Sequence, residues 1–86
     1  MPTLFIFFGL RFMFFSNDHE PIHVHVIKGK GYIKESAIFQ VVPGIKLIEN
    51  NGLSKQEIRL AEMIIEENSV LIQERWKTYF GKKINE

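Results

Sequence analysis

The sequence predicts an α+β domain in which an antiparallel sheet of about five strands is followed by one long or kinked C-terminal helix packed on it. Apolar residues recur at intervals of two up to about residue 49, as in strands, and at intervals of three and four after residue 54, as in helices. Consecutive strands followed by a helix are typical of α+β domains. We expect one domain over residues 1–86, with the β part at 3–49 and the helical part at 54–81.

The first fifteen residues predict two strands of a hairpin. Six of the eight phenylalanines fall in this segment, and Gly9 interrupts the apolar run where a turn is needed. Both faces of these strands are apolar, so we expect them to be central in the sheet or covered on both sides. The segment lacks the basic start and cleavage site of a signal peptide, and Arg11 interrupts a run too short to span a membrane. We therefore expect a soluble, cytoplasmic protein.

The next segment predicts a loop and then a third strand. SNDHEP at residues 16–21 contains turn-forming Asn and Asp, and Pro21 favours an extended chain before it. In a strand from about Ile22 to Lys28, the valines would point to one face of the sheet and the two histidines to the other. The remaining β elements expected are a turn at 29–31, a strand at 32–41, a turn at 42–45 and a short strand at 45–49.

The C-terminal part predicts a helix. Ser54 followed by Glu57 is the pattern of a capping box, which starts a helix at Lys55. The apolar stripe keeps its phase past Asn68, which favours a single helix to about Phe80; two helices separated at residues 68–69 are the alternative. Gly81 would follow its C-terminus. The stripe consists of Ile58, Ala61, Ile65, Ile72, Trp76 and Tyr79.

All three histidines lie within NDHEPIHVHV, residues 17–26. His23 and His25 would leave the same face of the third strand, where two imidazoles can reach one metal ion or share acid–base work near neutral pH. A third group would come from the preceding loop. The candidate catalytic residues are His19, His23, His25, Asp18 and Glu20, and the candidate metal ligands are His19, His23 and His25.

The spacing alone leaves the role of these histidines open. Together with Arg11, Lys28 and Lys30 they could bind an anion such as phosphate. They could equally be polar residues on the open face of a strand, or contacts to a partner. The sequence leaves the cofactor unknown; a divalent metal is possible but not expected. The absence of cysteine removes thiolate ligands and nucleophiles and fits a reducing compartment. The net charge of +1 gives no general case for nucleic-acid binding, which stays open as a local contact.

The motif FFSNDHEPIHVHV, with the start Met-Pro-Thr, resembles the small prokaryotic family catalogued as domain of unknown function 4160. The residues that carry the resemblance are Met1, Pro2, Thr3, Asn17, Asp18, His19, Pro21, His23, Val24, His25, Val26, Gly52, Leu53, Ser54 and Trp76. Phe15 departs from the pattern, which has Tyr there. The family brings no assigned reaction. Its members resemble components of two-gene units, which implies a small protein partner, of toxin–antitoxin type by analogy.

Two hypotheses about function follow. The first is a binding or regulatory module. We expect it to form a homo-oligomer or a complex with a small protein, because so many apolar residues are hard to cover in 86 residues. We expect no binding to a membrane. The second is a small hydrolase or nuclease that uses the three histidines, with or without metal. A structure would discriminate between the two hypotheses. Imidazoles that converge in an open concavity would favour the enzyme hypothesis, and imidazole rings bonded to backbone carbonyls would favour the binding-module hypothesis.

Overall fold

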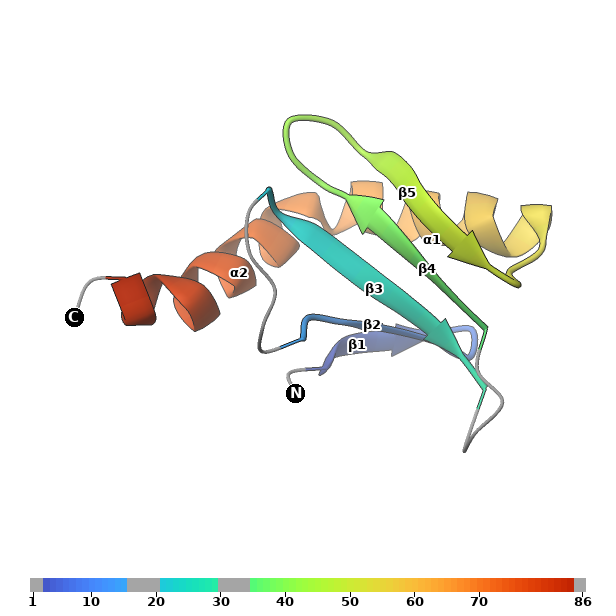
Figure 1. Ribbon diagram of the computed structural model, residues 1–86, viewed down its shortest axis with the longest axis horizontal. Helices are drawn as coiled ribbons and strands as arrows, with labels where there is room; N and C mark the ends of the chain where they lie inside the picture. The colour runs from blue at the N-terminus through green and yellow to red at the C-terminus, as the bar shows by residue number, and fades with distance from the viewer. Residues whose placement is uncertain (1–2, 16–20, 30–34, 85–86) are drawn as a thin grey trace.

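The computed structural model describes residues 3–15, 21–29 and 35–84, with side chains to Gly81. Its five antiparallel strands follow the order β1-β2-β3-β4-β5, and two helices lie on one face of the sheet (Figure 1). This architecture confirms the predicted α+β class and the strand number. The elements are β1 (Thr3–Phe7), β2 (Leu10–Met13), β3 (His23–Lys28), β4 (Glu35–Gln40), β5 (Lys46–Asn51), α1 (Lys55–Glu67) and α2 (Ser69–Ile84).

β1 and β2 form the hairpin expected around Gly9. Phe7 pairs with Leu10, and the two residues between them have positive φ angles, 51° at Phe8 and 77° at Gly9. Two such residues are characteristic of the type I′ hairpin turn, which prefers Asn followed by Gly. A left-handed backbone costs a residue with a side chain roughly 1–2 kcal/mol. Phe8 therefore occupies a strained position in which glycine or asparagine would be more stable.

The expected burial of the N-terminal strands is correct for β2 and wrong for β1. β1 is an edge strand, and the exposed fractions of its end and turn are 57% at Ile6, 41% at Phe7 and 80% at Phe8. β2 lies inside the sheet, and Leu10 and Phe12 are buried. The difference follows from strand order, because a neighbouring strand lies on both sides of β2 and on one side of β1.

The core lies between the helices and the face of the sheet to which the β3 valines point. Val24 and Val26 are fully buried. Their cross-strand partners extend the same face, because residues directly opposite each other on adjacent strands share a face. The other members of the core are Leu10, Phe12, Phe14, Ala37, Phe39, Val41, Leu53, Ala61, Ile64, Ile65, Ile72, Trp76 and Phe80.

The single C-terminal helix preferred from the sequence is wrong, and the alternative of two helices is correct. α1 ends at Glu67, and the Asn68 side-chain amide donates to the Ile64 carbonyl at 2.8 Å. Asn competes with the helix by such side-chain bonds to the backbone, which accounts for the break. The break is slight, since the Ile72 N–H donates to the Asn68 carbonyl at 2.9 Å. The expected end at Gly81 is also wrong, because α2 continues to Ile84.

Lys28 and Glu57 form an ion pair that joins the end of β3 to the start of α1. The predicted capping box is present, because the Ser54 N–H donates to Glu57 Oε1 at 2.9 Å and the Glu57 N–H donates to Ser54 Oγ at 3.1 Å. The hydrogen bond from Lys28 and then that from the Ser54 N–H hold the pKa of the Glu57 carboxyl below its ordinary value of 4.5. The same ion pair raises the pKa of Lys28, with Glu35 at 3.7 Å adding a smaller effect.

Trp76→Ala tests whether α2 is held to the sheet by its aromatic anchor. The Trp76 side chain is 3% exposed, so its removal leaves a large cavity and should lower the free energy of unfolding by about 3–5 kcal/mol. Trp76→Phe should cost less, because a ring still fills part of the site. Urea denaturation measures both, and a midpoint unchanged in Trp76→Ala would refute the packing.

Glu57→Gln tests the ion pair through the pH dependence of stability. Because folding lowers the pKa of Glu57, its ionisation stabilises the fold above pH 4.5, and this contribution is lost as the pH falls through the depressed pKa of the folded state. We expect the wild-type free energy of unfolding to fall more steeply than that of Glu57→Gln in urea titrations below pH 4.5. Glu62→Gln, an exposed position on the same helix, should follow the wild type. Parallel profiles for wild type and Glu57→Gln would contradict the assignment.

Candidate functional site

β3 places His23 and His25 on the face of the sheet opposite the helices. Both histidines are half-buried, and Val24 and Val26, which alternate with them, are fully buried. The parity of a strand therefore separates the two pairs of side chains as the sequence predicts. The centroids of the two imidazole rings lie 5.4 Å apart.

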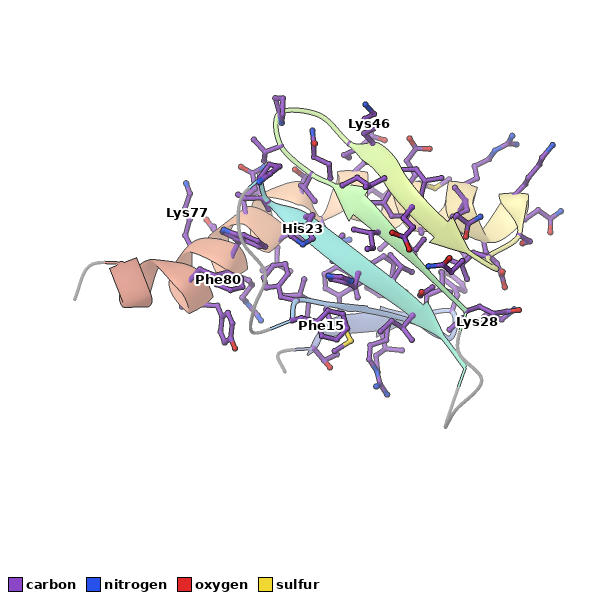
Figure 2. All side chains as sticks on the ribbon, viewed as in Figure 1. Phe15, His23, Lys28, Lys46, Lys77 and Phe80 are labelled. Carbon is purple, nitrogen blue, oxygen red and sulfur yellow. The ribbon has the colours of Figure 1, made fainter. Side chains whose placement is uncertain are left out.

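His23 is fixed by contacts on several sides. Its Nδ1 lies 2.9 Å from the Pro21 carbonyl oxygen. A carbonyl oxygen only accepts, so Nδ1 carries the proton. The Trp76 ring of α2 lies 5.4 Å from the His23 ring, which makes one helix residue a neighbour of the candidate site. Figure 2 shows His23 at the start of β3, near α2. Since the interaction with Pro21 spans only two residues, the loop that enters β3 orients the ring directly.

His25 lies between Phe15 and His23. The Phe15 ring stands edge-on to the imidazole, with a centroid separation of 4.3 Å. Met13 of β2 and Ile38 of β4 are directly opposite His25 on the adjacent strands. We call the surface formed by Phe15, His23 and His25, with Trp76 at its edge, the aromatic–histidine face.

Trp76 connects the aromatic–histidine face to the core. Its ring lies 5.0 Å from that of Phe14 and 4.3 Å from that of Phe80. Phe80 is in turn 4.7 Å from Tyr79. The sequence assigned Trp76 to the helical core stripe alone; its contact with His23 was missed, because no local pattern links positions so far apart in the chain. The result is a continuous series of rings from β2 and β3 to α2.

Among the described residues, the site offers two imidazoles and their aromatic neighbours. His19, Asp18 and Glu20, the other predicted catalytic candidates, lie outside the described residues. Within the described part of the chain, no three metal-ligating side chains come together. His23 and His25 remain the two residues that could ligate a metal, and an open site would need a further ligand.

Lys28 does not join the histidines as an anion site would require. It shares the face of β3 with Val24 and Val26, and its ammonium pairs with Glu57 and Glu35 on that face. Strand parity accounts for this, because positions 24, 26 and 28 alternate with positions 23 and 25. Arg11 is exposed on β2, opposite Ile27, and Lys30 lies outside the described residues.

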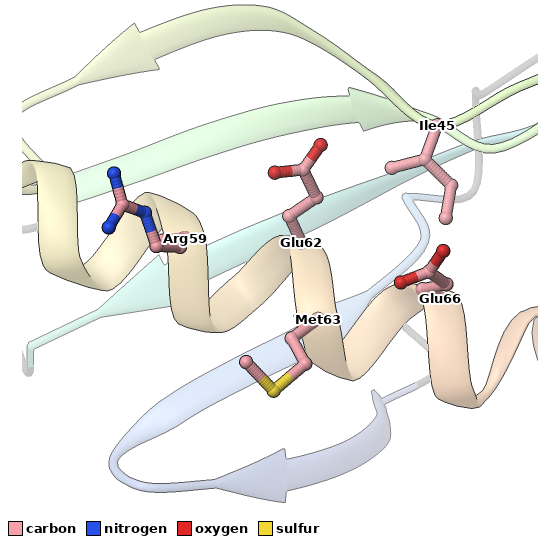
Figure 3. A pocket seen from close by; sticks show the side chains of 5 residues that line it. All are labelled: Ile45, Arg59, Glu62, Met63 and Glu66. Carbon is pink, nitrogen blue, oxygen red and sulfur yellow. The ribbon is translucent and has the colours of Figure 1, made fainter.

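A separate cavity of about 410 Å³ lies between α1 and the segment that joins β4 to β5 (Figure 3). Its lining residues are Ile45, Arg59, Glu62, Met63 and Glu66. The four helix residues are exposed, and none of them is an imidazole or a thiol. The cavity offers an open, charged surface away from the aromatic–histidine face.

The fold and the face define a small α+β domain with two half-buried imidazoles packed among aromatic rings. The model of the family described as Domain of unknown function (DUF4160) matches residues 9–77. The chain therefore belongs to this family, which confirms the resemblance seen in its histidine motif. Searches of the curated proteins and of the solved structures found no match. In the described residues, neither helix is long and apolar enough to cross a membrane.

The tautomer of His23 provides a direct test of the site geometry. Neutral imidazole usually favours the proton on Nε2, whereas the Pro21 carbonyl requires it on Nδ1. Long-range ¹H–¹⁵N spectra above neutral pH should therefore find Nδ1 protonated in His23. His23→Gln assigns the resonance by its loss. A dominant Nε2–H form would contradict the contact with Pro21.

Proposed function

We propose that the chain is a binding or regulatory module, one component of a two-gene unit of toxin–antitoxin type whose partner is a small protein. The observation that carries the proposal is the packing of the His23 ring among the Pro21 carbonyl, the His25 ring and the Trp76 ring. A ring held in this way suits a rigid contact surface. A general acid or base needs a ring directed at a reacting group in a cleft.

The surroundings of the two histidines have the composition of a protein contact. Aromatic residues and Met are enriched at the centres of protein interfaces, and charged residues are depleted there. Among the described residues, the uncharged Phe15, Met13 and Ile38 lie next to His25, with Met13 buried. Rings that are already packed lose little conformational freedom on binding, which favours affinity.

The class of partner rests on the resemblance, because members of this family resemble components of two-gene units. The net charge of +1 gives no electrostatic reason to prefer a nucleic acid. Uncharged rings and aliphatic side chains favour a protein surface that offers apolar groups together with hydrogen-bonding groups for the imidazoles. The product of the neighbouring gene is therefore the partner to test.

A small His-dependent hydrolase or nuclease is the second candidate. Its support is the 5.4 Å separation of the His23 and His25 rings, which lets both imidazoles act on one substrate group. A complete site would draw on His19, with Asp18 or Glu20 to orient a ring. These residues belong to the same segment as Pro21, so the enzyme hypothesis makes the segment 18–25 a single functional unit.

Replacing both histidines tests the module. A double His23→Gln, His25→Gln variant keeps polar side chains on the half-buried face but removes both rings. We expect its affinity for the purified product of the neighbouring gene, measured by titration calorimetry, to fall at least tenfold, about 1.4 kcal/mol. Val70→Gln, at a position 68% exposed on α2, should bind as the wild type does. Thermal unfolding of each variant confirms that the fold persists.

The same proteins separate the two candidate functions. Each is incubated with RNA and with DNA, with and without added Zn²⁺ or Mn²⁺. Hydrolysis by the wild type that the double variant lacks would favour the hydrolase and overturn the module. Unchanged partner affinity in the double variant would remove the aromatic–histidine face from the proposal.

A further inference from the structure

β1 presents an unprotected edge of the sheet. In the described residues, the strand order leaves β1 without a neighbour on one side, where backbone N–H and C=O groups can pair with another strand. The strand, TLFIF, contains no charged residue and no proline. Its residue Ile6 is 57% exposed. The pairing with β2 shifts register between Thr3 and Phe5, so the regular part of the edge is the apolar stretch at residues 5–7. An apolar edge of this kind is a template for strand addition.

The other edge of the same sheet is protected. β5, KLIENN, carries Lys46 and Glu49 and ends in two asparagines. Charged side chains on an edge strand oppose pairing with further strands, because pairing would desolvate them. The β5 edge thus carries the charged residues that usually protect an edge strand, and the β1 edge lacks them. This difference indicates that another chain covers the β1 edge.

The helix layer does not provide the cover. In Figures 1 and 3, β1 lies outside the part of the sheet crossed by α1. Phe5 and Phe7 contact each other at 5.2 Å on the edge of the core, and Phe7 stays 41% exposed. Phe8 extends the apolar strip past the end of β1, with an exposed ring on a strained backbone. Strain at an exposed aromatic residue is characteristic of a contact surface.

The surface area is also larger than a monomer of this mass requires. The solvent-accessible surface is 5931 Å² for a chain of 10.1 kDa. The usual relation between mass and surface gives about 5,300 Å². The excess of about 600 Å² is spread over the whole elongated chain, 40 × 28 × 19 Å, so it leaves room for an interface without locating one.

We propose that two copies of this chain pair antiparallel through their β1 edges, about a two-fold axis near Phe5, and join their sheets into one. Self-pairing of β1 brings no charges together; it sets Phe5 against its own copy and Ile6 against Leu4, which are favourable apolar cross-strand combinations. Pairing of β1 with β5 would instead meet Lys46 and Glu49 and would leave one β1 edge open to further copies. Self-pairing uses both β1 edges and leaves the charged β5 edges at the two ends, so association stops at the dimer. The interface lies on β1, apart from the aromatic–histidine face, and so goes beyond the proposed function.

A matched pair of edge substitutions tests the interface. Ile6→Lys places a charge on the β1 edge, and Ile48→Lys places one at a similarly exposed position, 53%, on the β5 edge. Sedimentation at high micromolar concentration should find a dimer for the wild type and for Ile48→Lys. Ile6→Lys should raise the dimer dissociation constant at least tenfold, with an unchanged circular dichroism spectrum. A monomeric wild type, or a dimer disrupted equally by both variants, would overturn the proposal.

Single cysteines provide a second measurement that does not depend on the lysine variant folding. The chain has no cysteine, so one introduced residue can form a disulfide only with its own copy. Near a two-fold axis in an antiparallel pair, equivalent Cα atoms come within the range that a disulfide needs. Leu4→Cys, Phe5→Cys or Ile6→Cys should cross-link rapidly under mild oxidation, and Ile48→Cys should not. Cross-linking at residue 48 alone would move the interface to β5 and refute the assignment to β1.

Discussion

The burial of Val24 and Val26 against the helix layer is the constraint on which the rest of the molecule depends. β3 pairs with β2 on one side and β4 on the other, so its register is fixed from both sides. With both valines fully buried, a shift of one residue would bring the imidazoles into the core and the valines to the surface. The positions of His23 and His25 on the outer face are thus a consequence of core packing, and the site is as rigid as the central strand.

Trp76 extends this constraint to the second layer. It packs on Phe14 and Phe80 inside the core and also contacts His23. Helix, sheet and aromatic–histidine face therefore share one side chain. Loss of Trp76 would change stability and the setting of His23 together, whereas substitution of His25 acts on the face without removing a core anchor. A loss of binding on substitution of Trp76 can therefore reflect lower stability, whereas a loss on substitution of His25 reports on the aromatic–histidine face.

The features of the fold that could be predicted are those that depend on local sequence patterns. The change from a period of two to a helical period locates the sheet and the helices, and the capping box at Ser54 and Glu57 sets the start of α1 within a residue. The break at Asn68 was expected only as the alternative, because the apolar stripe keeps its phase across it and the hydrophobic pattern does not reveal the local bond from the Asn68 amide to the Ile64 carbonyl. The order of strands was also beyond local pattern, and β1 was expected in the interior for that reason.

Some features of the candidate site could likewise be predicted from local sequence patterns, and others could not. Parity predicted that His23 and His25 share a face opposite the valines, as they do. Parity also places Lys28 on the face of the valines. An anion site was suggested because Lys28 is close to the histidines in sequence. Its actual partner, Glu57, belongs to a helix whose position in space the sequence does not give. The contact between Trp76 and His23 has the same origin. Long-range contacts of this kind depend on how the helices pack on the sheet, and local sequence patterns do not contain that information.

The two proposed surfaces are geometrically compatible. An antiparallel edge pairing about an axis perpendicular to the sheet keeps equivalent faces on the same side, so a dimer through β1 would present two aromatic–histidine faces in parallel. A partner that is itself a symmetric dimer could then engage both faces at once, and the second contact would form at the high effective concentration of an intramolecular step. Weak binding at each pair of rings would be sufficient for a stable complex under that arrangement. The affinity of the complex would then depend on the β1 edge even though no residue of β1 contacts the partner.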